Sequence, residues 1–276
     1  MSLSVMHKSN NSGPGFSHGV WGYCPLAGIK VDPELGRFFH DDFANFQAHA
    51  TSGSAEQQYG TYLDTGASFV KSADEVDGAI EVSGNDADND EAHIITGGNA
   101  GGMLVVKSVD LAAQRFWFEA SVETASIAAD GVAFFIGLAE EGMAAADALV
   151  DDTGALADKD YIGFRTLHAD NDGLDAVYNT AGGGGESIHV ESGATTAPAA
   201  MTLAAATAVK VGLYYDGSHV HWYVNGEDVD STGVGVKHDA TNLPDGEELC
   251  LCLLTKVGTA AAVEVKAHFW AAAQLF

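Results

Sequence analysis

Acidic side chains next to a tryptophan are the first residues in this sequence whose types and spacing could do chemistry. Glu119 and Glu123 fall on one face of a predicted strand, and Trp117 lies beside them on that face. Glycoside hydrolysis needs two carboxylates about 5 to 10 Å apart, and an indole ring can stack on a pyranose. Trp117 and Glu119 are therefore a candidate glycan contact. A solvent-facing polar strand explains the same pattern more simply, and no residue is assigned a catalytic role.

A second acidic group lies in the loop at residues 83–91. Asp86, Asp88 and Asp90 supply carboxylates at alternate positions, as calcium-binding loops do. The loop lacks the glycine at the sixth position and the glutamate at the twelfth that the helical calcium hand requires. A bare acidic loop is thus the favoured interpretation, calcium is the alternative, and no other cofactor is expected.

Histidines and cysteines give weaker signals. His219 and His221 are two residues apart on a predicted strand and could supply two zinc ligands, but a third ligand is not evident. We therefore expect a partly exposed strand face. Cys250 and Cys252 share one face of another strand, where they are poorly placed to bond each other. They are predicted to be small buried hydrophobic residues in a chain made in a reducing cytoplasm.

The elements that position these residues are best defined at residues 210–229. Asp216-Gly217 and Asn225-Gly226 are turn dipeptides that separate two stretches with alternating apolar residues, which is the strongest short-range signal of a β-hairpin. The inward-facing residues are predicted to be Val211, Leu213 and Tyr215 on the first strand and Val220, Trp222 and Val224 on the second. A hairpin this apolar on one face needs a second sheet to cover it.

Short strands separated by glycine- and aspartate-containing turns continue through most of the chain. They are predicted at residues 38–43, 78–82, 92–96, 102–106, 115–123, 132–138, 161–165, 174–178, 187–191, 249–255 and 262–270. Residues 132–138 are apolar enough to be buried on both faces. Alanine-rich residues 140–149 are the one predicted short helix. The fold class is therefore all-β, a two-sheet antiparallel sandwich over residues 38–276.

Residues 1–37 differ from the rest and are predicted to form an extended N-terminal arm. They are rich in Gly, Ser, Asn and Pro, and their large apolar residues, Phe16, Trp21, Tyr23 and Leu26, follow no period. Ordering such an arm costs about 1 to 2 kcal/mol per residue, so these side chains must be buried against something. Either the arm packs on its own domain or these four residues anchor it to a partner. Under the second interpretation, the sandwich should fold without the arm.

The charge balance excludes some classes of partner. The chain has 12 Lys and Arg against 39 Asp and Glu, a formal net charge of −27. A surface this acidic repels nucleic-acid phosphates and anionic lipid headgroups, so neither nucleic acid nor membrane is an expected partner. No stretch approaches the ~18 consecutive apolar residues of a transmembrane helix, and the first residues lack a signal-peptide core.

Several segments together resemble the concanavalin A-like lectin/glucanase jelly roll. They are residues 39–43, 116–122, 130–138, 211–217, 221–226 with the turn Tyr-Val-Asn-Gly, and 263–269. The resemblance covers residues 38–276 and implies a jelly-roll sandwich. Hydrolases of this superfamily carry a Glu-x-Asp-x-x-Glu strand. The strand with Glu119 and Glu123 lacks the middle aspartate, so the resemblance implies a protein that is not an enzyme.

A narrower similarity is to tailed-bacteriophage structural proteins that carry this jelly roll. Residues 85–92, 137–142, 157–165 and 175–178 resemble them. This resemblance implies a decoration protein on the capsid exterior of a virion, attached through the arm, with the major capsid protein and sister subunits as partners. Local threefold symmetry of a capsid would favour a homotrimer. The alternative is a carbohydrate-binding module, with host-surface glycans as ligands.

Overall fold

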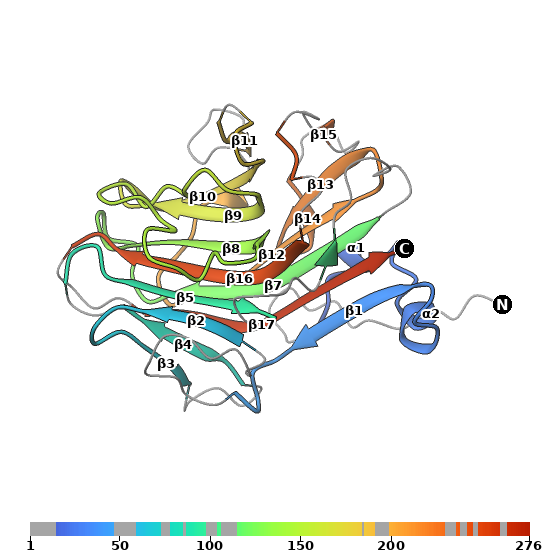
Figure 1. Cartoon of the computed structure of the whole chain (residues 1–276), viewed down its shortest axis with the longest axis horizontal. Helices are drawn as coiled ribbons and strands as arrows, with labels where there is room; N and C mark the ends of the chain where they lie inside the picture. The colour runs from blue at the N-terminus through green and yellow to red at the C-terminus, as the bar shows by residue number, and fades with distance from the viewer. Residues whose placement is uncertain are drawn as a thin grey trace.

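The chain folds into two antiparallel β-sheets packed face to face, as Figure 1 shows for this computed structural model. The structure describes residues 15–46, 59–72, 78–84, 87–97, 104–105, 115–183, 185–190, 199–229, 236–237, 242–244, 248–259 and 264–276. The main core lies between the sheets and contains residues such as Phe118, Phe134 and Trp222, all at most 1% exposed. The predicted fold class, an all-β two-sheet sandwich, is confirmed.

Within the described residues, sheet A has nine strands, with β14-β13-β12-β7-β17-β4-β3 as its main path, β1 beside β17 and β15 beside β13. The strands are β1 (Gly36–Asp41), β3 (Ser68–Lys71), β4 (Ile80–Ser83), β7 (Phe116–Thr124), β12 (Val209–Tyr215), β13 (His219–Val224), β14 (Glu227–Asp228), β15 (Val236–Lys237) and β17 (Glu264–Leu275).

In the part of the chain that the structure describes, sheet B has eight strands, in the order β11-β10-β9-β8-β16-β5-β2, with β6 beside β16. Its strands are β2 (Tyr59–Leu63), β5 (Glu91–Thr96), β6 (Leu104–Val105), β8 (Val132–Glu140), β9 (Tyr161–Leu167), β10 (Asp170–Asn179), β11 (Ser187–Val190) and β16 (Glu248–Val257). The described helices are α1 (His18–Trp21), α2 (Leu26–Val31) and one 3-10 turn, Ala199–Met201. None of these helices is long enough to span a bilayer.

The hairpin of residues 210–229 forms with the predicted register. Val211 pairs with Val224, Leu213 with Trp222 and Tyr215 with Val220, and all six side chains belong to the main core. Asn225 and Gly226 both have positive φ, as a turn at the end of β13 requires. Phe116, Phe118, Ala120 and Val122 also face the core from β7, as their alternation predicts.

The predicted helix at residues 140–149 is wrong. Glu140 ends β8, and residues 141–160 form a long loop that lies on the outer face of sheet B. Gly142 and Asp147 both have positive φ, which a helix cannot accommodate. Met143, Ala144 and Leu149 from this loop pack on Phe135 and Cys252 of the sheet. This cover explains why β8 is buried on both faces, as its sequence predicts.

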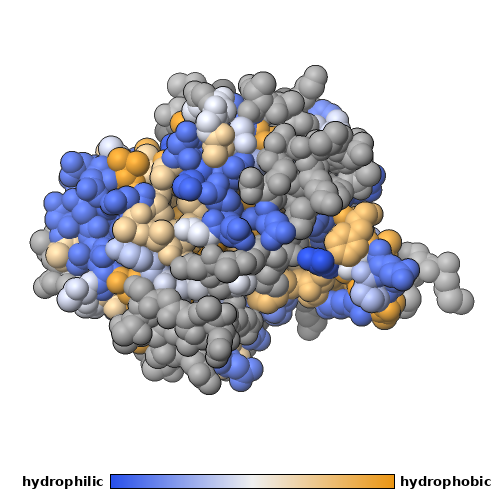
Figure 2. All heavy atoms as spheres, in the orientation of Figure 1, coloured by the Kyte–Doolittle hydropathy of each residue, from blue (hydrophilic) through white to orange (hydrophobic). Residues whose placement is uncertain are grey.

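The arm covers the outer face of sheet A. Val20, Trp21 and Ile29 pack on Trp117 and Tyr214 of the sheet, and all five residues are at most 6% exposed. The first strand, β1, starts at Gly36, close to the predicted start at Phe38. Figure 2, in the orientation of Figure 1, shows hydrophobic residues on the surface at the end of the molecule that carries α2.

Candidate functional site

A pocket of about 700 Å³ lies between the arm and the β12-β13-β14 edge of sheet A, and we call it the arm pocket. Its walls combine aromatic side chains with charged and polar ones. They are His18, Gly19, Tyr23, Arg115, Tyr214, Asp216, Ser218, His221, Tyr223, Gly226 and Asp228. An apolar pocket with a few convergent polar groups is the usual form of a small-molecule site.

Parallel rings line one side of this pocket. Tyr214 on β12 stacks on Trp117 of β7, with ring centroids 5.1 Å apart, and on His221 of β13 at 5.6 Å. These contacts follow from the register, which pairs Tyr214 with both residues across the sheet. Tyr23 from the arm stacks on Tyr214 at 6.2 Å and is 74% exposed. Tyr23 therefore offers a free aromatic surface at the mouth of the pocket.

Hydrogen bonds fix the polar groups of the arm pocket. Asp216 accepts from the backbone N–H groups of Ser218 and His219, both at 2.7 Å, and its Oδ2 lies 3.5 Å from Nε2 of His221. Partial burial favours the neutral acid, but these hydrogen bonds outweigh burial and lower the pKa of Asp216. Asp216 is therefore an anionic acceptor, and the Arg115 guanidinium in the same wall is a donor.

Close backbone approach holds the arm in place over β13. A Cβ atom at Gly19 would lie 2.4 Å from the carbonyl oxygen of Gly226 and 3.1 Å from the Tyr223 ring. A glycine is therefore required where α1 crosses the turn between β13 and β14. This contact holds α1 close to β13 and to the turn that follows it.

Glu119, on the outer face of β7, anchors the arm through hydrogen bonds. Its carboxylate accepts from the backbone N–H of Ser17 at 3.0 Å and from Nε1 of Trp21 at 2.8 Å. Nearby, Lys210 donates to the carbonyl oxygen of Gly15 at 2.6 Å. Burial raises the pKa of Glu119 and lowers that of Lys210, because both charges are removed from water.

The prediction of a glycan contact at Trp117 and Glu119 is therefore wrong. The two residues are 0% and 1% exposed, because the arm lies over the face of β7 that carries them. The simpler interpretation, a solvent-facing strand, is wrong for the same reason. Neither interpretation anticipated that an arm distant in sequence would occupy this face.

The four apolar residues of the arm have different environments. Trp21 is buried in its own sandwich, and Phe16 packs on Trp21 with tilted rings 4.9 Å apart and lies edge-on to Phe38. Of the two alternatives left open by the sequence, packing on its own domain therefore describes Phe16 and Trp21. Leu26 is half-buried and Tyr23 is exposed, and for these two an anchoring role stays a prediction.

The acidic loop of residues 83–91 is described only in part, because Asp86 lies outside the described residues. Asp88 is exposed, and the main chain of Asp90 bonds to Val257 through its carbonyl oxygen at 2.9 Å. Within the described ranges, no three His, Cys, Asp or Glu side chains lie close enough to hold a metal ion, His219 and His221 included. Cys250 and Cys252 are not disulfide-bonded to each other and are fully buried, as predicted.

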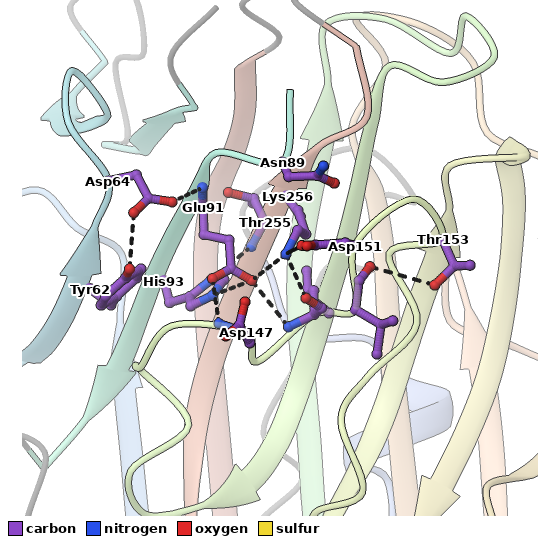
Figure 3. Close-up of polar contacts among 12 residues, drawn as sticks. Tyr62, Asp64, Asn89, Glu91, His93, Asp147, Asp151, Thr153, Thr255 and Lys256 are labelled. Carbon is purple, nitrogen blue, oxygen red and sulfur yellow. Dashed lines mark hydrogen bonds and ion pairs between the residues drawn. The ribbon is translucent and has the colours of Figure 1, made fainter. Parts of the chain in front are cut away.

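A buried charged network lies on the other sheet, under the loop of residues 141–160 (Figure 3). Glu91 on β5 accepts from the backbone N–H groups of Asp147 at 2.7 Å and Leu149 at 3.2 Å. Lys256 on β16 lies 3.2 Å from Glu91, contacts Asp151 at 2.5 Å and donates to the carbonyl oxygen of Leu149 at 2.8 Å. These bonds tie the loop to the sheet.

His93 completes this network and is fixed as a hydrogen-bond acceptor at one nitrogen. Its Nδ1 accepts from the backbone N–H of Thr255 at 3.3 Å, and its Nε2 lies 3.4 Å from Glu91. Nδ1 must therefore be unprotonated. Glu91, His93 and Lys256 are each at most 2% exposed, so the network has the residue types of an active site without access for a substrate. The network therefore holds the loop of residues 141–160 on sheet B.

Comparisons with known proteins identify the fold. No family model and no curated protein matches the chain. A protein of unknown function from Shewanella oneidensis MR-1 is 11% identical, with 96% of this chain and 97% of that chain covered and a TM-score of 0.52. SCLam, a non-specific endo-β-1,3(4)-glucanase from family GH16, is 10% identical over 87% of this chain and 92% of its own, with a TM-score of 0.50.

Peanut lectin also matches, at 14% identity over 87% of this chain and 99% of its own, with a TM-score of 0.47. The two-sheet antiparallel topology and the likeness to the glucanase confirm the predicted jelly-roll sandwich of the concanavalin A-like type. At these identities the likeness shows the fold alone. These likenesses do not bear on a virion role, so the phage resemblance rests on the sequence segments.

Sequence reasoning missed the arm pocket as a site. The sequence singles out two residues of its wall for other roles, His221 as half of a zinc pair and Tyr23 as a partner anchor. The available signal was the cross-strand alignment of Tyr214 and His221, which the predicted hairpin register already implies. The contribution of the arm had no local signal, because it depends on contacts between residues about 100 positions apart.

Proposed function

We propose that this chain is a glycan-binding module and that the arm pocket is its binding site. The observation that carries the proposal is the exposed ring of Tyr23, parallel to Tyr214 at the mouth of a pocket with polar walls. The carbon-bound hydrogens of a sugar ring pack on an aromatic face, while its hydroxyl groups need partners that both donate and accept.

The polar groups of the pocket fit this requirement. Asp216 and Asp228 accept, Arg115 donates, and the hydroxyl groups of Tyr223 and Ser218 can do both. A ligand that only accepts or only donates would leave half of these groups unused. A polyhydroxylated ring uses both kinds, and the pocket volume of about 700 Å³ lies within the range of small-ligand sites.

We propose binding without hydrolysis. A glycosidase needs a general acid that is still protonated near neutral pH, which usually means a raised pKa. The pKa of Asp216 is lowered instead, by hydrogen bonds from Ser218, His219 and His221. The fold itself supports either outcome, since it occurs in a glucanase and in a lectin.

A glycan array followed by calorimetry with the best ligand tests this proposal. Replacing Tyr23 by alanine should weaken binding at least tenfold without changing the unfolding temperature, because the ring is exposed. Phe276→Ala is the matched control, since Phe276 is an aromatic residue that is 54% exposed and not in the pocket wall. Equal affinity of the Tyr23→Ala protein and the unaltered chain would contradict the proposal, as would release of reducing ends from the bound glycan.

A role on a bacteriophage capsid is a second proposal, and one observation favours a protein partner. Val31 and Leu35 of the arm are 81% and 39% exposed, and Phe276, whose N–H bonds to the carbonyl oxygen of Leu35, is 54% exposed. Apolar side chains grouped at one end of a molecule often mark an interaction site. Co-sedimentation with capsids that lack the protein would test attachment, and a Val31→Asp, Leu35→Asp variant should fail to attach.

A further inference from the structure

A second pocket, of about 460 Å³, lies on sheet B and takes no part in the arm pocket. It is enclosed by residues just before β9, the end of β10 and the turn that follows β10. The wall consists of Leu156, Ala157, Asp158, Tyr161, Asn179, Gly182, Gly185 and Glu186. We call it the β10 pocket.

The central residue of the β10 pocket is Asn179, the last residue of β10. Its side chain is 1% exposed, and its Nδ2 donates to Oδ1 of Asp158 at 3.0 Å and to the carbonyl oxygen of Lys159 at 2.9 Å. Both amide hydrogens are therefore used. Its Oδ1 has no hydrogen-bond partner among the described residues. A buried amide oxygen without a donor is costly, so this atom points to a missing partner that donates.

The other polar groups of the wall also lack spare donors. Tyr161 donates its hydroxyl hydrogen to Oε2 of Glu186 at 2.6 Å, and Gly182 N–H donates to Asp158 at 3.2 Å. Among the described residues of this wall, Tyr161 and Asn179 are the only side chains that can donate a hydrogen bond. What remains is acceptor capacity on Asp158, Asn179 and Glu186, because an ionised carboxylate accepts about four hydrogen bonds.

Two carboxylates line the β10 pocket, and Asp158 is the main source of its negative charge. Oε1 of Glu186 is paired with Arg165 at 2.5 Å, whereas the hydrogen bonds to Asp158 come from the neutral N–H groups of Asn179 and Gly182. The wall therefore repels an anion. A ligand hydroxyl group would find acceptors for its hydrogen there, but no side-chain donor for its oxygen. A cation with several N–H donors satisfies both the charge and the hydrogen bonds.

We propose that the β10 pocket binds a primary ammonium or guanidinium group. Such a group donates to Oδ1 of Asn179 and to the free lone pairs of Asp158 and Glu186, while Leu156 and Ala157 contact its alkyl carbons. A divalent metal is the weaker alternative, since the described residues do not bring three carboxylate, imidazole or thiolate groups together here. The test therefore includes a titration with a metal ion alone.

The test uses the full chain labelled with ¹⁵N and follows the Asn179 side-chain amide signals by NMR. Titration with n-butylammonium chloride should shift these signals in a saturable way, whereas n-butanol and calcium chloride alone should not. Nα-acetyl-lysine methylamide tests whether the cation is a lysine side chain of a partner, in which case it binds more tightly than n-butylammonium.

Glu186→Gln should weaken n-butylammonium binding at least tenfold, and Asp158→Asn is a second variant that removes the other charge. Glu141→Gln is the matched control, because Glu141 is exposed outside this wall and loses the same charge. Unchanged Asn179 signals at 100-fold excess of n-butylammonium would overturn the proposal. Equal shifts with n-butanol or with calcium chloride alone would also overturn it.

Discussion

At the residue scale, the burial of Glu119 fixes the position of the arm and therefore affects the proposed site. A lone carboxylate at 1% exposure is unstable unless donors compensate it, and here Ser17 and Trp21 provide them. The arm thus supplies the hydrogen bonds, and the carboxylate fixes the arm. Tyr23 is two residues beyond Trp21, so its position in the pocket depends on this anchor.

Replacing Trp21 by phenylalanine should therefore destabilise the protein by about 1.5 to 3 kcal/mol, because Glu119 stays buried and loses a hydrogen bond to a charged group. Trp117→Phe is the control, since Trp117 lies in the same apolar cluster but its Nε1 has no hydrogen-bond partner among the described residues. Urea unfolding measures both. Equal losses for the two variants would mean that ring size alone matters and that the Glu119 bond contributes nothing.

Trp21 also shows what the sequence could and could not predict at this scale. Its type and surroundings indicate that it must be buried somewhere, but the partner, Glu119, lies 98 residues away. The alternation of β7 places Glu119 on the outer face correctly. Whether that face meets water or another segment depends on long-range packing that no local pattern contains.

At the element scale, two irregular segments cover the two outer faces of a regular sandwich. The arm covers sheet A and the loop of residues 141–160 covers sheet B. Strand positions were predictable because period-2 alternation and Asp-Gly or Asn-Gly turns act over a few residues, as in β12 and β13. The loop was mistaken for a helix, since its alanines favour a helix while its shape depends on Glu91, more than 50 residues away.

Glu91→Gln should loosen this loop. Burial favours the neutral acid, but the bonds from His93, Asp147 and Lys256 outweigh it and lower the pKa of Glu91 below its ordinary 4.5. The ionised carboxylate therefore stabilises the fold above pH 4.5, and this contribution is lost as the pH falls through the lowered pKa. At pH 7 the substitution should lower the free energy of unfolding by about 3 kcal/mol, because it removes one of the two carboxylate partners of the buried Lys256.

Hydrogen exchange at the amides of Asp147 and Leu149 measures this effect directly, because both donate to Glu91. Their exchange should speed up in Glu91→Gln and stay unchanged in Glu141→Gln, which alters an exposed glutamate of the same loop. The stability difference from the unaltered chain should shrink as the pH drops below 4.5. A pH-independent difference would show that the charge of Glu91 is not what holds the loop.

At the scale of the whole molecule, the net charge of −27 acts together with the fold. Lys210 donates to Gly15, Arg165 pairs with Glu186, and Lys256 pairs with Glu91 and Asp151, whereas Arg115 lies in the wall of the arm pocket. Acidic side chains far outnumber basic ones over the chain as a whole. The acidic balance thus favours neutral ligands at the arm pocket and cations at the β10 pocket.

The same balance predicts that the chain does not bind nucleic acid. Affinity for DNA comes mainly from Lys and Arg side chains that release counterions from phosphates. On a strongly acidic surface the electrostatic contribution to binding becomes repulsive. On a DNA column at about 50 mM salt, where electrostatic attraction is strongest, the protein should elute with the unbound fraction. An anion-exchange column is the matched control, because there the same charge should give retention that salt reverses. Retention on DNA that falls steeply with salt would mean that basic side chains gather on part of the surface, and the charge argument for both pockets would then need revision.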